Sequence, residues 1–310
     1  MSVAVKVRVP GTSANCGPGF DAVGIACTIY NELELILSKQ GNLVIEIEGE
    51  GKGIIPTDEK NIVYQVIQTL LKKVDKKYQG IHIKMVNNIP LSRGLGSSAA
   101  AIVAGLFAAN VATGNTLSKE DILDMATAIE GHPDNVAPAI FGGVTTSVLQ
   151  GDQARYLRFV PPGKLSMVVA VPEFNLSTHA ARNVLPQTVP FKDAVFNISR
   201  TALVIGALCQ GEFHHLRYAL EDKIHQPYRE HLIPGMQKVF DAALHKGALG
   251  VAISGAGPCL LAFAQDRCDQ IGTEMVLAFA SNHIKASYFI LDIDTEGATV
   301  ISELNHFIKY

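Results

Sequence analysis

The stretch PLSRGLGSSAAAIVAG, residues 90–105, joins a loop of glycine and serine directly to an alanine-rich apolar segment. Backbone N–H groups at the start of a helix lack partners within the helix and carry a partial positive charge. A glycine loop leading into a helix is therefore suited to bind an anion such as phosphate. Gly94 and Gly96 permit close approach of the backbone, and the hydroxyls of Ser97 and Ser98 can cap the helix, bind an oxygen or coordinate Mg²⁺. The alternative is a glycine turn with a serine cap and no ligand.

Two common phosphate motifs fit this loop poorly. A Walker A loop ends in Gly-Lys-Ser/Thr, a triplet that the sequence lacks. Gly94, Gly96 and Ala99 satisfy the dinucleotide pattern G-x-G-x-x-A, but that pattern requires an acid at the end of a strand about 20 residues later. Here the acids at that spacing, Glu120 and Asp121, fall in the first turn of a predicted helix. A nicotinamide-dependent dehydrogenase is accordingly a distant alternative.

Hydrophobic periodicity predicts a mixed order of strands and helices. Period-two segments at 3–9, 31–37, 42–51 and 81–87 indicate strands. Further strands are expected at 144–149, 165–174 and 285–293, and a glycine turn separates two more within 251–264. Helices are expected at 60–77, 99–109, 116–130, 191–210, 212–222 and 235–245 and from residue 267. This order indicates an α+β fold. We place a domain boundary in the polar stretch 150–158, which gives domains at 1–155 and 156–310.

Composition excludes several classes of partner. The chain has 310 residues and a net charge of -3, so nucleic acid and anionic membranes are poor candidates. The most apolar segment, 99–109, is well short of the roughly 20 residues needed to cross a bilayer. The first residues alternate like a strand and lack the apolar run of a signal peptide. The five cysteines are scattered without a C-x-x-C pair, which favours reduced thiols and a cytoplasmic protein.

Three stretches together resemble the GHMP kinases. PLSRGLGSSAA is similar to their nucleotide-binding loop, and VPGTSANCGPGFDAVG at 9–24 and AISGAGP at 252–258 match in the family's order. Within that superfamily, TSANCGPGFDAVG and EGHPDNVAPAIFGG (130–143) resemble the homoserine kinase branch. The resemblance implies the two-domain GHMP kinase fold, with a ribosomal S5 domain 2-like N-terminal domain and a ferredoxin-like C-terminal domain. It also implies a substrate cleft and a homodimer.

The same resemblance assigns ATP and Mg²⁺ to the loop. Mg²⁺ would be held by Ser98 and by Glu130, a carboxylate at a predicted helix end, where a cation offsets the helix dipole. The alternative for Glu130 is a solvated acid. Only Gly131 separates Glu130 from the following histidine, fewer residues than in some relatives, so Asp124 or Asp134 are alternative ligands. The nucleotide-binding set is Asn61 (beside the adenine), Pro90, Leu91, Ser92, Arg93, Gly94, Leu95, Gly96, Ser97, Ser98, Ala99 and Ala100.

The implied acceptor is L-homoserine, which carries a carboxylate, an ammonium and a hydroxyl. By resemblance Asp21 pairs with the ammonium, Arg182 and Arg229 bind the carboxylate, and Asn135 orients the hydroxyl. Without the resemblance, each arginine would be read as a surface charge. The full acceptor set is Asn15, Asp21, His132, Asn135, Arg182, Arg229, Gly255 and Gly257. Cys16, beside this set, is a possible target of thiol reagents.

Phosphoryl transfer depends mainly on positioning and on charge neutralisation. We therefore expect a catalytic set of Ser98, Glu130 and Asn135 without a dedicated base, and Asp21 as a base is the competing hypothesis. Two alternatives remain for the whole chain. One is a kinase of the same superfamily that acts on another small alcohol, and the other is a nucleotide-binding protein without catalysis.

Overall fold

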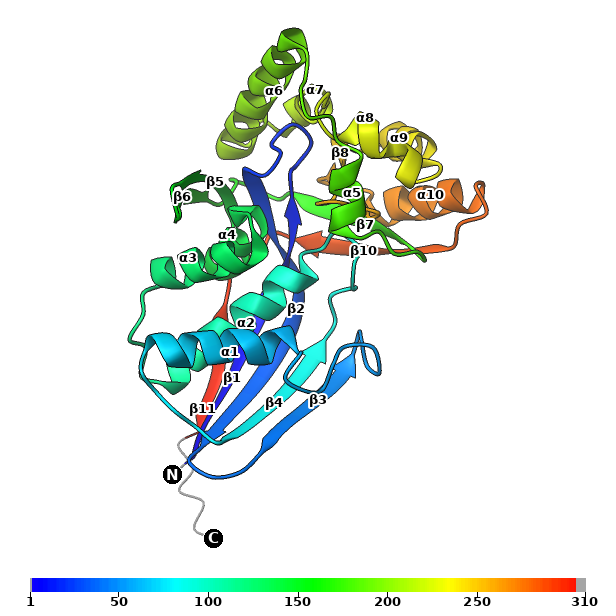
Figure 1. Ribbon diagram of the computed structural model, residues 1–310. Coiled ribbons are helices and arrows are strands. Elements are labelled where there is room, and N and C mark those ends of the chain that lie inside the picture. Colours follow the sequence, from blue (N-terminus) through cyan, green and yellow to red (C-terminus); the bar gives the residue numbers. More distant parts are fainter. Residues whose placement is uncertain (1, 305–310) are drawn as a thin grey trace.

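The computed structural model describes residues 2–304, which form two β-sheets that are each covered by helices (Figure 1). The seven-stranded sheet has the order β11-β1-β2-β4-β3, and β5 and β6 extend from β2. Its strands are β1 (Ser2–Ala14), β2 (Val23–Ser38), β3 (Leu43–Gly49), β4 (Gly80–Asn87), β5 (Val144–Gln150), β6 (Gln153–Phe159) and β11 (Thr299–Leu304). The four-stranded sheet has the order β10-β7-β9-β8, from β7 (Ser166–Pro172), β8 (Gly250–Ile253), β9 (Leu260–Ala264) and β10 (Ala286–Asp292).

The helices divide between the two sheets. Those near the large sheet are α1 (Ile62–Lys73), α2 (Ser97–Ala112), α3 (Lys119–Glu130) and α4 (Pro133–Phe141). The later ones are α5 (Thr178–Asn183), α6 (Phe191–Gln210), α7 (Leu216–Ala219), α8 (Gln226–Arg229), α9 (Met236–His245) and α10 (Cys268–Ala280), with 3-10 turns at Phe213–His215 and Glu230–Leu232. Within residues 2–304, no helix is both long and apolar enough to cross a membrane.

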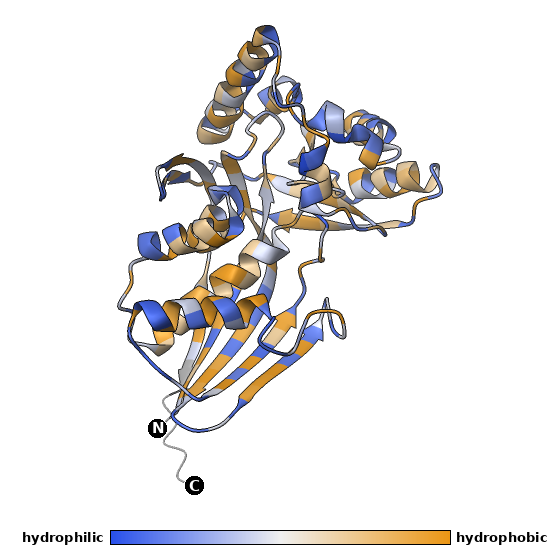
Figure 2. Cartoon of the chain, in the orientation of Figure 1, coloured by the Kyte–Doolittle hydropathy of each residue, from blue (hydrophilic) through white to orange (hydrophobic). Residues whose placement is uncertain are grey.

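The large sheet has one apolar and one charged face, as the alternating bands along β2, β3 and β4 in Figure 2 show. Leu33, Leu35 and Leu37 of β2 are buried against the helices. On the opposite face, ion pairs link neighbouring strands, such as that between Lys6 Nζ and Glu32 Oε2 at 2.6 Å. A sheet covered on one side requires this alternation of apolar and polar residues.

Helix α2 lies at the centre of this layer, where it contacts β1, β2, α1, α3 and α4. It is apolar on all sides and most of its residues are buried, which explains why its sequence lacks a polar stripe. Its first turn begins at Ser97, directly after the glycine loop, so the core fixes the position of that loop.

Strand β7 is buried on both faces. Val168 and Ala170 pack in the same core as α9 and α10, whereas Met167 and Val169 join the larger core that also contains residues of α6 and α7. This double burial explains the continuous apolar run of the strand.

The structure confirms the α+β fold and most expected elements, and within residues 2–304 it adds five helices and strands that periodicity missed, among them the short α8. The others are α4, which contains Pro138, the short α5, and the strands β6 and β11. β6 runs across the predicted boundary between residues 155 and 156 and pairs with β5 in the large sheet, and β11 pairs there with β1. The division into domains at 1–155 and 156–310 stays a prediction.

Candidate active site

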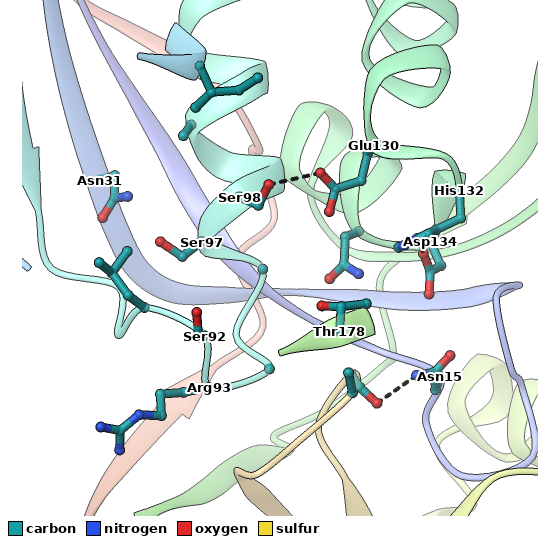
Figure 3. A pocket seen from close by; sticks show the side chains of 18 of the residues that line it. Asn15, Asn31, Ser92, Arg93, Ser97, Ser98, Glu130, His132, Asp134 and Thr178 are labelled. Atoms are coloured by element: carbon teal, nitrogen blue, oxygen red, sulfur yellow. Dashed lines mark hydrogen bonds and ion pairs between the residues drawn. The ribbon is translucent and has the colours of Figure 1, made fainter. Parts of the chain in front are cut away.

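A single cavity collects residues from the large sheet, from the helices, and from loops that belong to both parts of the chain. Its walls are the glycine loop before α2, the loop after β1, the junction of α3 and α4, the start of α5, and the loop between β8 and β9. Figure 3 shows this arrangement. From the predicted sets the cavity gathers Asn15, Asp21, Leu91, Ser92, Arg93, Gly94, Gly96, Ser97, Ser98, Glu130, His132, Asn135, Arg182, Arg229 and Gly255.

The glycine loop leaves the first amides of α2 available to a ligand. Gly96 is the N-cap residue, with a left-handed φ of 68°, and no side chain caps the helix there. A Cβ on Gly96 would lie 1.9 Å from Thr12 Oγ1, and one on Gly94 would lie 2.1 Å from the Ser254 carbonyl oxygen. Both glycines are therefore required by sterics and by backbone conformation. The residues fit an anion bound by exposed helix amides.

Residues next to the four-stranded sheet hold the glycine loop on the side away from the cavity. Ser254 Oγ donates to the Gly94 carbonyl at 2.7 Å, and Cys259 N donates to the Arg93 carbonyl at 3.1 Å. The Arg93 guanidinium also bonds to the Pro172 carbonyl and, at 3.1 Å, to Asn175 Oδ1. The predicted nucleotide residues Pro90, Leu95, Ala99 and Ala100 are buried in this support and do not line the cavity.

Ser98 and Glu130 face one another across the start of α2, where Ser98 Oγ donates to Glu130 Oε2 at 3.0 Å (Figure 3). Glu130 is the last residue of α3, as expected. Burial raises the pKa of Glu130, and the Ser98 hydrogen bond and the nearby His132 only partly oppose that rise. Among the described residues no lysine or arginine forms an ion pair with Glu130. A half-buried carboxylate beside a hydroxyl fits Mg²⁺, which prefers oxygen ligands.

The alternative magnesium ligands lie in different places. Asp124 Oδ1 accepts from Ala154 N at 2.8 Å, which ties α3 to β6 outside the cavity. Asp134 does line the cavity, and its carboxylate bonds to His132 Nδ1. Ligand atoms of Asp134, His132 and Asp21 lie within 4.8 Å of one another. Arg182 engages both carboxylate oxygens of Asp21, which disfavours a second cation at this cluster.

Opposite charges meet at the end of the cavity that holds the predicted acceptor residues. Arg182 Nη2 and Nη1 donate to Asp21 Oδ1 and Oδ2 at 2.7 and 3.0 Å, a bidentate pair. Asn15 orients this region because its Oδ1 accepts from Asp21 N at 3.0 Å and its Nδ2 donates to the Gly255 carbonyl at 2.7 Å. Arg229 is almost fully buried on the same wall.

Two further polar residues of the predicted acceptor set, His132 and Asn135, line the same part of the cavity. Burial alone would lower the pKa of His132, but the hydrogen bond and charge of Asp134, with the charge of Asp21, outweigh burial and raise it. Asn135 Oδ1 accepts from Thr12 Oγ1 at 2.8 Å, which leaves its amide nitrogen free to donate. Gly257 does not line the cavity, because it packs against Ile233 and Ile253.

The other end of the cavity is formed by residues outside the motifs. Asn61 is fully buried behind it and serves as the N-cap of α1, accepting from Val63 N at 2.9 Å. It does not line the cavity. The lining residues that sequence reasoning missed are Asn31, Ile55, Ile62, Met85, Asn87, Ala101, Thr178 and Ala256. Ala256 falls within the motif AISGAGP, and the others come from several separate segments of the chain, so no shared local pattern identifies them.

Family models match both parts of the chain. The model of the GHMP kinases N terminal domain matches residues 61–143, and that of the GHMP kinases C terminal region matches residues 204–277. The fold likeness extends to L. major mevalonate kinase, with a TM-score of 0.71 at 18% identity over 94% of this chain and 96% of that one. The expected two-domain GHMP kinase fold is thus confirmed.

Nearer relatives identify the branch. The chain is 44% identical over 295 residues to the homoserine kinase of Moorella thermoacetica, covering 95% of this chain and 99% of the relative. It is also 44% identical over 298 residues to that of Trichormus variabilis, covering 96% and 98%. The crystal structure of homoserine kinase from Cytophaga hutchinsonii has a TM-score of 0.88 at 33% identity, over 96% of this chain and 97% of that one. This chain therefore belongs to the homoserine kinase family of GHMP kinases.

Proposed function

We propose that this chain transfers the γ-phosphoryl group of ATP to the side-chain hydroxyl of L-homoserine, with the triphosphate on the loop 94–98. The observation that carries the proposal is one cavity in which uncapped amides of α2 lie beside an acid and two arginines suited to an amino acid. The product, O-phospho-L-homoserine, would serve threonine biosynthesis.

The residues around α2 account for the donor. The uncapped amides that follow Gly96 suit the phosphate oxygens, and the support from Ser254 and Cys259 holds the loop in place before ATP binds. Ser98 and Glu130 would hold Mg²⁺, which neutralises charge on the phosphates when it is bound. Ile55, Ile62 and Met85 offer an apolar site for the base.

The acceptor end suits a zwitterion. In the structure Asp21 and Arg182 neutralise one another. The ammonium of homoserine would replace Arg182 as a partner of Asp21, and its carboxylate would take up Arg182 and Arg229. After this exchange, each charged group of the substrate and of the site contacts a group of opposite charge. An alcohol with only one charge would leave Asp21 or the arginines without such a contact, so the site disfavours it.

The chemistry we propose is direct in-line transfer without a strong base. The acceptor oxygen forms a bond to the γ-phosphorus as the bond to the bridging β,γ oxygen breaks, and ADP leaves. Asn135 orients the attacking hydroxyl, whose proton is lost to the transferred phosphoryl group or to solvent. The bidentate contact with Arg182 supports a binding role for Asp21 in place of a role as base.

The test is ADP release from the purified chain. We expect release to require both Mg²⁺ and L-homoserine, and mevalonate or a sugar in place of homoserine to give only background. Release with mevalonate alone would identify a different small-alcohol kinase. Tight ATP binding without turnover of any alcohol would instead indicate a nucleotide-binding protein without catalysis.

We also propose a homodimer and a cytoplasmic location, both of which rest on the sequence. Sedimentation equilibrium of the full chain tests the first: a mass of twice the 33.2 kDa chain is expected, and a mass equal to one chain at micromolar concentration would contradict it.

A further inference from the structure

Arg229 is a buried cation without a carboxylate partner among the described residues. Its side chain is 1% exposed, and Nε donates to the Ala181 carbonyl at 3.0 Å. Nη1 donates to the Gly255 carbonyl at 3.2 Å and to His225 Nδ1 at 3.1 Å. Within residues 2–304, Nη2 has no hydrogen-bond partner, and burial lowers the pKa of Arg229 to about 10. A buried guanidinium on a cavity wall, with one nitrogen free, favours an anionic ligand in that cavity.

His225 controls how this guanidinium is held. The ring is fully buried, and Nε2 lies 2.6 Å from the Gly17 carbonyl, so Nε2 must carry the proton that it donates. Nδ1 is then free to accept from Arg229. Burial lowers the pKa of His225, which keeps the ring neutral and Nδ1 an acceptor even though Asp222 opposes that shift. The two contacts together fix one tautomer.

The segment that carries His225 is itself held rigidly. The buried carboxylate of Asp222 accepts from the backbone N–H groups of Ile224, His225 and Gln226 at 2.9, 2.9 and 2.6 Å, and from Asn197 Nδ2 at 2.6 Å. Gln226 Oε1 accepts from Ile253 N at 2.7 Å, which ties the start of α8 to β8. These hydrogen bonds fix the backbone at His225, and therefore the position of its ring relative to Arg229 and Gly17.

Gly17 lies in the loop between β1 and β2 that also carries Asn15 and Asp21. The Phe20 ring of this loop lies 5.2 Å from the His225 ring and 5.4 Å from the guanidinium carbons of both Arg182 and Arg229. The His225 imidazole thus connects the loop that carries Asp21, the proposed partner of the ammonium, to Arg229, a proposed partner of the carboxylate.

We propose that His225 is a positioning residue for acceptor binding, which acts through Arg229 and touches no substrate itself. Its Nδ1 directs the free Nη2 of Arg229 at the carboxylate of the amino acid, and its Nε2–H holds the loop of Asp21 at the matching distance. The inference rests on the proposed function, because His225 would support the residues that bind homoserine without contacting homoserine itself.

Substitutions can separate the two ring nitrogens. Asparagine places its amide near Nδ1 and can still accept from Arg229, whereas glutamine reaches Nε2 and can still donate to Gly17. We expect His225→Ala and His225→Gln to raise the KM for homoserine by about tenfold, the value of one hydrogen bond to a charged group. We expect His225→Asn to raise it by no more than about threefold, and the KM for ATP to change by less than about twofold in all three.

A double-mutant cycle with Arg229→Lys separates positioning from a general loss of structure. If His225 acts through Arg229, His225→Ala should add less than about twofold to the homoserine KM in that background. The proposal would be overturned if the two substitutions raised the KM for homoserine by independent factors that multiply in the double variant. Equal rises in the KM for ATP and for homoserine would overturn it as well. Homoserine turnover by the wild type tests the proposed function separately.

A measurement on the unaltered chain does not depend on the folding of variants. Nitrogen-15 spectra of the histidine rings should show one buried ring protonated at Nε2 and unprotonated at Nδ1, with its signals shifted when homoserine binds. A ring protonated at Nδ1 could not accept from Arg229, and that result would also overturn the proposal.

Discussion

Asp21 shows how a residue's role follows from its contacts. Its carboxylate receives two hydrogen bonds from Arg182, and Asn15 fixes its backbone N–H. A base must be free to take a proton from the hydroxyl of the acceptor. A carboxylate already engaged on both oxygens by a guanidinium is better suited to exchange one cation for another.

Asp21→Asn should therefore act mainly on binding. We expect the homoserine KM to rise by at least about tenfold and kcat to fall by less, since the charge that pairs with the ammonium is lost. Steady-state kinetics measure both constants, and the exposed Asp152→Asn is the control. A collapse of kcat at unchanged KM would instead make Asp21 the base.

The raised pKa of Glu130 predicts a pH dependence of magnesium activation. Mg²⁺ binds the ionised carboxylate, and burial moves protonation to higher pH than for an exposed glutamate. On acidification from about pH 8 to about pH 5, the affinity for Mg²⁺ should begin to fall above the ordinary glutamate range, and then fall about tenfold per pH unit. The effect on folding stability has the opposite sign. The folded state binds the Glu130 proton more tightly than the unfolded chain does, so the contribution of Glu130 to the free energy of unfolding rises as the pH falls.

The control for this prediction is Glu130→Gln. Protonation of ATP weakens Mg²⁺ binding equally in both proteins, so the ratio of their magnesium activation constants isolates Glu130. A ratio that stays constant across this pH range would contradict the assignment.

The sequence left open whether Cys16 reacts with thiol reagents, and its burial argues against a fast reaction. It is 1% exposed, and burial raises the pKa of its thiol, whereas Cys209 is exposed. A disulfide reagent should label the exposed Cys209 and the partly exposed Cys268 before Cys16, without loss of activity, and Cys209→Ser should remove the part of this early labelling that belongs to Cys209. Inactivation that tracks modification of Cys16, followed by mass spectrometry, would show that the loop after β1 opens.

Helix α2 and its glycine loop illustrate what a single element reveals in sequence. The glycines, the serines and the apolar run predicted both the helix and its ligand class, because these properties depend on local backbone geometry. The support from Ser254 and Cys259 and the base end of the cavity escaped prediction, since those residues are distant in sequence. His225 escaped for a different reason: a lone histidine carries no pattern.

Gly94→Ala tests the packing of this loop. The new methyl group would lie 2.1 Å from the Ser254 carbonyl, at a φ of +83° that disfavours alanine. We expect a loss of about 2 kcal/mol or more of unfolding free energy and a marked rise in the KM for ATP.

Gly163→Ala is the matched control because its φ is +81° and nothing lies within 4 Å of the added Cβ. It should cost only about 1 to 2 kcal/mol and leave the KM for ATP unchanged. Equal effects of the two substitutions on the KM for ATP would contradict this view of the loop.

For the whole molecule, periodicity predicted the type of most elements but not how they pair. The alternation of Leu33, Leu35 and Leu37 specified a half-buried strand wherever its partners lay. The pairing of β11 with β1 joins opposite ends of the chain, so no local signal could place it. Pro138 lacks the N–H that the interior of a helix uses, yet α4 forms within the core. Most residues of the predicted acceptor set line one cavity because each motif falls on a loop beside it, and their role in binding the acceptor stays a prediction.

The central claim is that one cavity places the triphosphate of ATP on the loop 94–98 beside an amino acid held by Asp21, Arg182 and Arg229. A crystal structure with a non-hydrolysable ATP analogue, Mg²⁺ and L-homoserine tests it most directly. The account predicts phosphate oxygens on the first amides of α2, Mg²⁺ between Ser98 and Glu130, and the homoserine hydroxyl in line with the γ-phosphorus. A nucleotide bound elsewhere, with this loop free of phosphate, would contradict it.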